Sequence, residues 1–297
     1  MNNVNYKSGF IAIMGSPNVG KSTLMNELVG MKVAIVTNKA QTTRNKVVGI
    51  LTRKDYQMVF LDTPGLHTPS NRLGEFMVKT AYSASQDVDV TLMLIDAKMG
   101  IKERDEQIIT RLNKGNFIAV INKIDAVSEQ RIAELEDKLK LLGVEDEQIL
   151  QISALNRTGL NELENKLLKY MLPGPQFYPE DMVTDRPERF IAAEIIREKA
   201  LVNLREEVPH GVGVEIEKVE ELEDITNVDA VIYCERDSHK GIIIGKKGAM
   251  LKLIGSQART DLEKLFGTKV FLQLWVKVKK DWRNSSHMLK ELGYRDE

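Results

Sequence analysis

The sequence has almost none of the residues that cross-link small secreted domains, and it has no long apolar run. Cys234 is the only cysteine among 297 residues, so no internal disulfide can form. The longest apolar runs, at 90–95 and 117–121, are far shorter than the ~20 residues that a membrane-spanning helix requires. The N-terminus also lacks the basic and then apolar pattern of a signal peptide. We therefore expect a folded cytoplasmic protein without a transmembrane span.

The formal net charge is only −1 at pH 7, but the charges are unevenly distributed along the chain. Acidic residues outnumber basic ones between Glu180 and Glu235. From Arg236 to Arg283 the sign reverses, and basic residues greatly outnumber acidic ones. A local excess of this size is the electrostatic footprint of a polyanionic partner.

The first half of the chain alternates short apolar runs with segments of helical periodicity. Several of the apolar runs are apolar on both faces, which is typical of buried strands in a mostly parallel sheet. We therefore expect an α/β doubly wound domain with a mostly parallel six-stranded sheet. Its strands are predicted at 10–14, 46–51, 58–61, 90–96, 117–122 and 148–152, and its helices at 21–29, 73–85, 103–113, 129–142 and 160–169.

A proline-rich segment divides the chain. Residues 171–179 hold three of the eight prolines, which neither a helix nor a central strand accepts readily. We place a linker at 174–187, between a first domain at 7–173 and a second domain at 188–281. The remaining residues, 282–297, are expected to form a C-terminal tail.

The second domain has a different periodicity. It is predicted to begin with a long helix, to continue with two strands, and to end with two helical stretches and a strand. That order, α-β-β-α-α-β, indicates a small α+β domain. The first helix is expected at 188–207, and the strands at 212–221, 228–235 and 270–278.

A glycine-rich loop joins the first predicted strand to the first predicted helix. It reads Gly15-Ser16-Pro17-Asn18-Val19-Gly20-Lys21-Ser22, followed by Thr23. The pattern GxxxxGKS in this strand–loop–helix context indicates a phosphate-binding loop, whereas a bare glycine turn rarely falls there by chance. Backbone N–H groups would cradle the phosphates, Lys21 would reach the β- and γ-phosphates, and the Ser22 hydroxyl would ligate Mg²⁺.

A second motif follows the third predicted strand. Asp62-Thr63-Pro64-Gly65 places a carboxylate in the Mg²⁺ shell and a glycine N–H near the γ-phosphate. Such a turn would be weak evidence alone. After a phosphate-binding loop it is the expected next element.

Two later motifs predict that the base is guanine. Asp125, in Asn122-Lys123-Ile124-Asp125, can accept from the N1–H and the exocyclic amine of guanine, a donor pair that adenine lacks. Asn122 would tie this loop to the phosphate-binding loop, and the Lys123 stem would lie along the base. Ser153-Ala154 would supply a backbone donor for the guanine carbonyl. We therefore predict a strong preference for GTP over ATP.

The residues near the γ-phosphate predict slow unaided hydrolysis. Leu66 follows Gly65, and an apolar side chain cannot orient a water molecule by hydrogen bonding. In the polar segment 39–45 we favour Thr43 over Thr42 as the hydroxyl that senses Mg²⁺ and the γ-phosphate, although simple solvation of a loop stays open. Lys21, Thr43 and Gly65 are therefore the candidate catalytic residues.

The charge that an arginine finger would supply has to come from elsewhere. Asn18 is a candidate ligand for a monovalent cation such as K⁺ beside the phosphates. Arg44 acting in cis, or merely packing in its loop, is an open alternative. We interpret His67 as a surface histidine rather than a catalytic one.

The basic region contains a Gly-x-x-Gly turn with two lysines, after three isoleucines and before a helix. In this context and element order, the turn indicates a KH domain of the type II arrangement, which clamps about four nucleotides of single-stranded RNA. A solvated helix-turn-helix with a basic loop is the alternative. Trp275 is expected to pack under a helix rather than to stack on a base. The candidate RNA contacts are Ile244, Gly245, Lys246, Lys247, Gly248, Lys252 and Arg259.

Over essentially its whole length the sequence resembles the Era family of bacterial GTPases of ribosome assembly. The resemblance is carried by GSPNVGKS, KAQTTR, DTPGLH, NKID, ISAL, HKGIIIGKKGAMLKLIG and LWVKVKKDW. It implies binding to the 3′ end of 16S rRNA and a role in 16S rRNA processing and 30S subunit biogenesis. It also implies peripheral association with the inner face of the cell membrane, and we expect a monomer.

The leading interpretation is a switch in which the nucleotide state of the first domain gates RNA binding by the second. Such gating requires that the GTP and GDP forms differ in RNA affinity. A constitutive RNA-binding module with a structural nucleotide domain is the alternative. A GTPase that modifies tRNA fits less well, because the second domain has neither a second cysteine nor a recognisable catalytic site.

Overall fold

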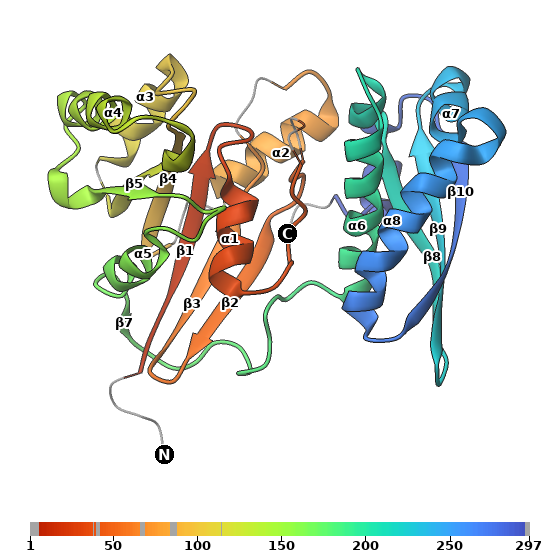
Figure 1. Ribbon diagram of the computed structural model, residues 1–297, viewed down its shortest axis with the longest axis horizontal. Coiled ribbons are helices and arrows are strands. Elements are labelled where there is room, and N and C mark those ends of the chain that lie inside the picture. The colour runs from red at the N-terminus through yellow and green to blue at the C-terminus, as the bar shows by residue number, and fades with distance from the viewer. Residues whose placement is uncertain are drawn as a thin grey trace. The chain divides into compact units, whose positions relative to one another are not determined.

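The computed structural model describes residues 6–37, 39, 42–65, 69–83, 88–113 and 115–294 (Figure 1). Its contacts divide the chain into two compact units. The first unit comprises 1–34, 43–67 and 77–185, and the second comprises 35–42, 68–76 and 186–297. Two short stretches of the N-terminal half therefore belong to the second unit.

The first unit is built on one sheet with the strand order β2-β3-β1-β4-β5-β6. β2 runs antiparallel to β3, and every other neighbouring pair in this order is parallel. The prediction of a mostly parallel six-stranded sheet is thereby confirmed. The strands are β1 (Lys7–Gly15), β2 (Val47–Arg53), β3 (Tyr56–Asp62), β4 (Val90–Asp96), β5 (Phe117–Asn122) and β6 (Ile149–Ile152).

Helices cover both faces of this sheet. β4 and β5 are buried along their whole lengths, which explains why their apolar residues are consecutive rather than alternating, as in 92–95 and 117–121. The helices are α1 (Lys21–Val29), α2 (Arg72–Ser83), α3 (Glu103–Leu112), α4 (Glu129–Leu141) and α5 (Leu160–Leu167).

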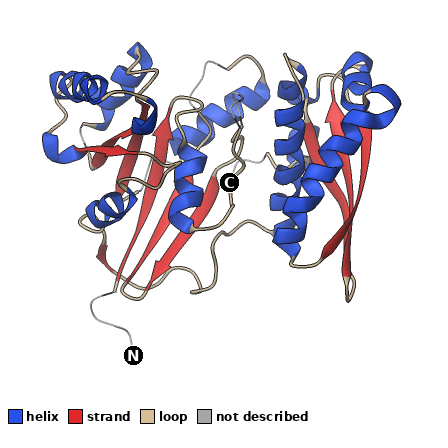
Figure 2. Ribbon diagram, in the orientation of Figure 1, coloured by secondary structure: helices blue, strands red, loops and turns tan. Residues whose placement is uncertain are grey.

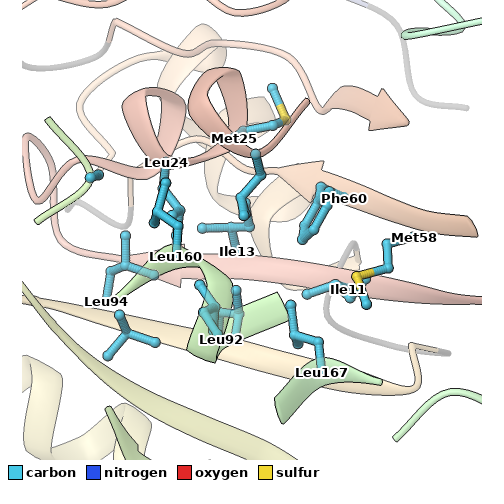
Figure 3. Close-up of a cluster of buried hydrophobic side chains, with 14 of the residues drawn as sticks. Ile11, Ile13, Leu24, Met25, Met58, Phe60, Leu92, Leu94, Leu160 and Leu167 are labelled. Atoms are coloured by element: carbon cyan, nitrogen blue, oxygen red, sulfur yellow. The ribbon is translucent and has the colours of Figure 1, made fainter. Parts of the chain in front are cut away.

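Alternation along β1 divides the core into two layers. Ile11 and Ile13 pack with side chains of α1 and α5 on one face of the sheet, as Figure 3 shows. Met14 belongs to a second cluster, which includes residues of α3 and α4. Successive side chains of a strand point to opposite faces, so this double covering follows directly from the pattern of the strand.

The proline-rich segment is more ordered than expected. Leu172–Pro173 forms a two-residue strand, β7, antiparallel to the start of β1. β4 pairs with β1 only from Ile11 onward, which leaves the first residues of β1 open to this partner. Beyond β7, the Gln57 Oε1 accepts from the backbone N–H groups of Phe177 at 2.9 Å and Tyr178 at 3.0 Å. The first part of the predicted linker is thus fastened to the first unit.

The second unit has the predicted order α-β-β-α-α-β. Its sheet has the order β10-β9-β8, in which β9 is parallel to β10 and antiparallel to β8. Figure 2 shows the helices and strands of this unit in separate colours. The elements are α6 (Glu188–Asn203), β8 (Gly213–Glu221), β9 (Ile225–Cys234), α7 (Asp237–Ile244), α8 (Ala249–Phe266), β10 (Lys269–Val278) and a last helix, α9 (Ser286–Glu291).

Helix α6 ends earlier than the predicted limit of 207. Its last residue is Asn203, whose side-chain amide donates to the Lys199 carbonyl at 2.7 Å. Leu204 then takes an extended conformation and is buried, 1% exposed. Burial of this leucine in the core outweighs the helical propensity of the residues that follow.

The expectation that Trp275 packs under a helix is wrong. Its side chain is 42% exposed, because β10 alternates and turns Val270 and Val276 toward the core instead. Trp282, in the predicted tail, is completely buried and donates from Nε1 to the Gly211 carbonyl at 2.9 Å. The residues after β10 therefore contribute to the folded second unit.

None of the helices in the described part of the chain combines the length and the apolar character needed to span a bilayer.

The two tryptophans provide a test of this packing. Trp282→Ala should lower the free energy of unfolding by about 3–5 kcal/mol, because it leaves a cavity and an unpaired Gly211 carbonyl. Trp275→Ala is the matched control and should cost much less, since a surface substitution usually changes stability by about 0.5 kcal/mol or less. Urea unfolding followed by circular dichroism measures both. Similar losses would contradict the assignment of Trp282 to the core.

Candidate nucleotide site and RNA-binding surface

The backbone of the phosphate-binding loop requires glycine at two positions. Gly15 and Gly20 have φ angles of 143° and 104°, which side chains rarely adopt. A Cβ atom at Gly15 would lie 2.6 Å from the Leu94 carbonyl oxygen, and one at Gly20 would lie 2.3 Å from Asn122 Nδ2. The loop is therefore closed against Leu94 and Asn122 at these two positions, where neither neighbour leaves room for a side chain.

Lys21 folds back across this loop. Its side chain is nearly buried, and Nζ donates to the carbonyls of Gly15 at 3.0 Å and Ser16 at 3.2 Å. Burial lowers the pKa of the Lys21 ammonium, against the opposing effect of Asp62 and Asp105. A cation held in this way by carbonyl dipoles gains from any anion that enters the loop.

Three oxygen groups meet at one point beside the loop. Asp62 Oδ2 accepts from Ser22 Oγ at 2.6 Å and from Thr43 Oγ1 at 3.2 Å, and the two hydroxyls are 3.0 Å apart. Burial raises the pKa of the Asp62 carboxyl. Its other oxygen, Oδ1, is buried and has no hydrogen-bond partner among the described residues.

These groups fit a hard divalent cation. Hydroxyl and carboxylate oxygens are the ligands that Mg²⁺ prefers, and an orphaned carboxylate oxygen is costly unless a cation or a donor meets it. The structure brings together Ser22, Thr43 and Asp62, the residues predicted for Mg²⁺. The Thr42 hydroxyl lies elsewhere, 2.7 Å from that of Thr37. The geometry thus favours Thr43, as the sequence did.

Asn122 connects the phosphate-binding loop to the Ser153-Ala154 motif. Its Nδ2 donates to the Val19 carbonyl at 2.8 Å, and its Oδ1 accepts from the Ala154 N–H at 3.0 Å. The first bond is the tie to the phosphate-binding loop that the sequence predicts. The second bond engages one N–H of the Ser153-Ala154 pair, which was predicted to supply a backbone donor for the guanine carbonyl.

Lys123 and Asp125 flank this tie. Lys123 Nζ donates to the Asn18 carbonyl at 2.6 Å and to Asp96 Oδ2 at 2.6 Å, which holds its stem in place. Asp125 Oδ1 accepts from the Ser153 hydroxyl. Asn18 itself has a φ of 66°, a left-handed conformation that asparagine tolerates better than most residues.

Sequence reasoning missed two carboxylates of this site. Asp96 ends the apolar strand β4 and anchors Lys123, and the position at a strand end, as in Asp62, could have indicated it. Asp105 accepts from Ser16 Oγ at 2.7 Å, and it also accepts from the Lys102 N–H at the start of α3. Only a non-local contact reveals the role of Asp105 beside the loop.

The remaining nucleotide-site predictions fall on the switch turn. Thr63 Oγ1 donates to the Ile13 carbonyl at 3.0 Å, and a Cβ atom at Gly65 would lie 3.0 Å from Pro17. Leu66 and His67 lie outside the described residues. Arg44, the alternative source of positive charge, has a side chain that is 1% exposed.

The second unit carries the Gly-x-x-Gly turn between α7 and α8. Gly245 and Gly248 have φ angles of 72° and 80°, and among the described residues no heavy atom lies within 4 Å of a Cβ built at Gly248. The backbone is therefore open to close approach at that position. Lys246 and Lys247 lie between the glycines and are exposed.

Helix α8 extends this surface. It buries Ile254, Ala258 and Leu262, so its other side faces outward. Lys252 and Arg259 are exposed on that side and lie seven residues apart, about two helical turns. Two exposed apolar side chains that the sequence analysis did not select, Ile242 (49%) and Leu253 (44%), belong to α7 and α8. Leu253 could have been recognised because it falls outside the buried stripe.

Comparisons with known proteins match both parts of the chain. A family model of the 50S ribosome-binding GTPases matches residues 10–123, and a KH domain model matches residues 207–283. GTPase Era of Ruminiclostridium cellulolyticum is 50% identical over 295 residues, covering 98% of this chain and 99% of that protein. GTPase Era of Clostridioides difficile is 50% identical over 297 residues, covering 98% and 99%.

Solved structures agree along nearly the entire chain. An Era variant of Aquifex aeolicus bound to GDP and AlF4⁻ has 42% identity and a TM-score of 0.93, covering 97% of this chain and 99% of that one. A complex of Era with MgGDPNP and nucleotides 1506–1542 of 16S ribosomal RNA gives the same identity, TM-score and coverage. The chain belongs to the Era family of GTPases, with a GTPase domain followed by a KH domain.

Proposed function

We propose that this protein is a GTP-hydrolysing switch that binds the 3′ end of 16S rRNA and assists 16S rRNA processing and 30S subunit biogenesis. The observation that carries the proposal is the presence of two built sites on one chain: a closed phosphate-binding loop and an open basic Gly-x-x-Gly turn. The related Era complex with MgGDPNP and nucleotides 1506–1542 of 16S rRNA supports the same pairing of ligands.

In this proposal the phosphates lie in the loop at 15–22, with Thr23 beside it, and Lys21 balances their charge. Gly65 meets the γ-phosphate through its N–H, after the Thr63-Pro64 turn. Ser22, Thr43 and Asp62 would hold Mg²⁺. When bound, Mg²⁺ neutralises charge on the phosphate oxygens during transfer to water.

Base selection follows from the second half of the site. Asp125 accepts from the two guanine donors, while the Ser153 hydroxyl keeps its carboxylate oriented. Asn122 and Lys123 hold this reading loop against the phosphate-binding loop, so base and phosphates are recognised by one connected network.

The RNA contacts proposed are those of the Gly-x-x-Gly surface. Lys246 and Lys247 neutralise phosphates, and Gly245 and Gly248 allow the strand to approach the backbone. Ile244 offers an apolar contact for a base. Lys252 and Arg259 extend the basic surface along α8.

We further propose two functional domains, at 7–173 and 188–281, joined by 174–187 and followed by a tail at 282–297. The protein would act as a cytoplasmic monomer on the 30S subunit and associate peripherally with the inner face of the membrane. K⁺ at Asn18 would supply the positive charge that an arginine finger supplies elsewhere.

The gating itself can be tested by RNA binding. The parent protein should bind a 16S 3′-end oligonucleotide about 5- to 100-fold more tightly with a non-hydrolysable GTP analogue than with GDP, the range of typical allosteric couplings. Lys21→Ala should abolish this difference. The paired change Lys246→Ala and Lys247→Ala should weaken binding in both states. Equal affinities of the parent in both states would favour the constitutive module.

A substitution at one residue should change the base preference from guanine to xanthine. Asp125→Asn should weaken GTP binding at least about 100-fold, since each lost charge-assisted hydrogen bond contributes about 1.5–3 kcal/mol. The amide can still accept from Ser153 and can donate to the C2 carbonyl of xanthine, so xanthosine triphosphate should bind well. Fluorescence titration with both nucleotides measures the exchange. Unchanged GTP affinity would remove Asp125 from the base site.

Dependence on K⁺ can be tested without disturbing the loop. GTP hydrolysis by the parent should be faster in KCl than in NaCl at equal ionic strength. Asn18→Gly should remove the difference, because glycine tolerates the φ of 66° and keeps the backbone carbonyl that Lys123 contacts. Equal turnover of the parent in the two salts would rule out the cation at Asn18.

A further inference from the structure

Helix α6 carries two adjacent charged side chains that are almost completely buried. Arg197 is 1% exposed and Glu198 is 4% exposed. Charged groups are seldom buried to this extent unless they are paired and hydrogen-bonded. Their partners therefore indicate what the helix is built to hold.

Arg197 is fixed by a carboxylate on its own helix. Its Nε lies 2.7 Å from Glu194 Oε1, and its Nη2 lies 2.5 Å from Glu194 Oε2. Nη2 also donates to the backbone carbonyl of Thr42. Thr42 lies in the stretch 35–42, which belongs to the same compact unit as α6. The ion pair thus aims the guanidinium at this one carbonyl.

Glu198 holds the other end of the same stretch. Its Oε1 accepts from the Val36 N–H at 2.9 Å, and its Oε2 accepts from Lys199 Nζ at 2.8 Å. Within the stretch, the hydroxyls of Thr37 and Thr42 lie 2.7 Å apart. Two neighbouring residues of α6 therefore bind this segment: Glu198 accepts from the Val36 N–H, and Arg197 donates to the Thr42 carbonyl.

The carbonyl that Arg197 holds belongs to the peptide bond between Thr42 and Thr43. A peptide bond is planar, so fixing its oxygen restricts the position and direction of the Thr43 backbone. The Thr43 hydroxyl is the group that meets Ser22 and Asp62. Arg197 can thus influence the proposed Mg²⁺ site through the Thr42–Thr43 peptide bond, without contacting the nucleotide itself.

Helix α6 is also tied to the helix that follows the Gly-x-x-Gly turn. Lys199 Nζ lies 2.6 Å from Asp261 Oδ2 on α8, and Asn203 Nδ2 donates to Gln257 Oε1 at 2.6 Å. α8 begins at Ala249, directly after Gly248. The Gly-x-x-Gly turn is thus continuous with α8, and side-chain contacts connect α8 to α6. Arg197 of α6 in turn donates to the carbonyl of Thr42.

We propose that Arg197 is a positioning residue for Thr43, that Glu198 supports it, and that α6 is the element through which RNA and GTP influence each other. The inference rests on the proposed function, in which Thr43 senses Mg²⁺ and the γ-phosphate. A GTP-bound arrangement of Thr43 favours the position in which α6 holds Val36 and Thr42. By reciprocity, RNA that favours the same position of α6 and α8 tightens GTP binding by the same factor.

The test compares two arginines of α6. Arg197→Met removes the donor to Thr42 but keeps an apolar stem of similar length. Arg189→Met is the matched control, because Arg189 also donates to backbone carbonyls, those of Ile216 and Glu217, within the second unit. The affinity ratio of a GTP analogue to GDP and the Mg²⁺ concentration for half-maximal hydrolysis are measured without RNA.

Arg197→Met should lower the affinity ratio about tenfold, as loss of one charge-assisted hydrogen bond predicts, and should raise the Mg²⁺ requirement. GDP affinity should stay near that of the parent, because GDP lacks the γ-phosphate that Thr43 senses. The control should match the parent in all three. A merely structural role of Arg197 would weaken GDP and GTP binding alike, and parent-like ratios in Arg197→Met would overturn the proposal.

Arg197→Lys keeps the charge beside Glu194 and serves if the methionine variant does not fold. Its ammonium lacks the planar fork that joins Glu194 and Thr42, so the affinity ratio should fall here too, and a parent-like ratio would count against the proposal. The outcome is separable from the gating test. If the parent binds RNA equally in both states, the gating fails, while the Mg²⁺ requirement still reports on Arg197 alone.

Discussion

The hydrogen bonds of the Asp62 carboxylate join three segments that are far apart in the sequence. Ser22 lies in the first turn of α1, Thr43 follows the stretch held by α6, and Asp62 ends β3, yet both hydroxyls reach one carboxylate oxygen. The arrangement depends on the sheet. β3 pairs in parallel with β1, so the end of β3 lies beside the end of β1, where the phosphate-binding loop begins. Parallel strands with crossover helices bring their carboxyl ends to a single edge, and β5 brings Asn122 to that edge in the same way.

Local pattern was sufficient for most of the fold and for much of the site. β4, β5 and α1 begin and end at the predicted residues, because continuous apolar runs and a GKS-type loop have few alternative explanations. The Gly-x-x-Gly turn was likewise identified from composition and order. The sequence could not predict the burial or the contacts of side chains that depend on residues far away in the chain. Trp275 is exposed because helices pack on the opposite face of its strand, and Asp105 matters because Ser16 lies beside it.

Burial explains why Arg197 and Glu198 also escaped sequence analysis. On a helical wheel they look like ordinary surface charges of an amphipathic helix, and their neighbours Glu194 and Lys199 strengthen that impression. Their partners, the Thr42 carbonyl and the Val36 N–H, are backbone groups and leave no trace in a pattern of side-chain types. A buried ion pair contributes little net stability, because desolvation offsets most of the attraction. Such a pair is better understood as a device that fixes direction than as one that holds the fold together.

That distinction bears on how a nucleotide can control RNA binding at all. A ligand shifts an equilibrium only by its differential affinity for two arrangements, so the coupling needs a contact that exists in one of them and not in the other. Core contacts, such as those of Ile11 and Leu24, persist in any folded arrangement and cannot serve. A single guanidinium–carbonyl bond can form or break without unfolding either unit, and its contribution of about 1.5–3 kcal/mol corresponds to roughly a 10- to 100-fold change in affinity. One bond of the kind that Arg197 makes is therefore large enough to account for the whole of a typical allosteric coupling.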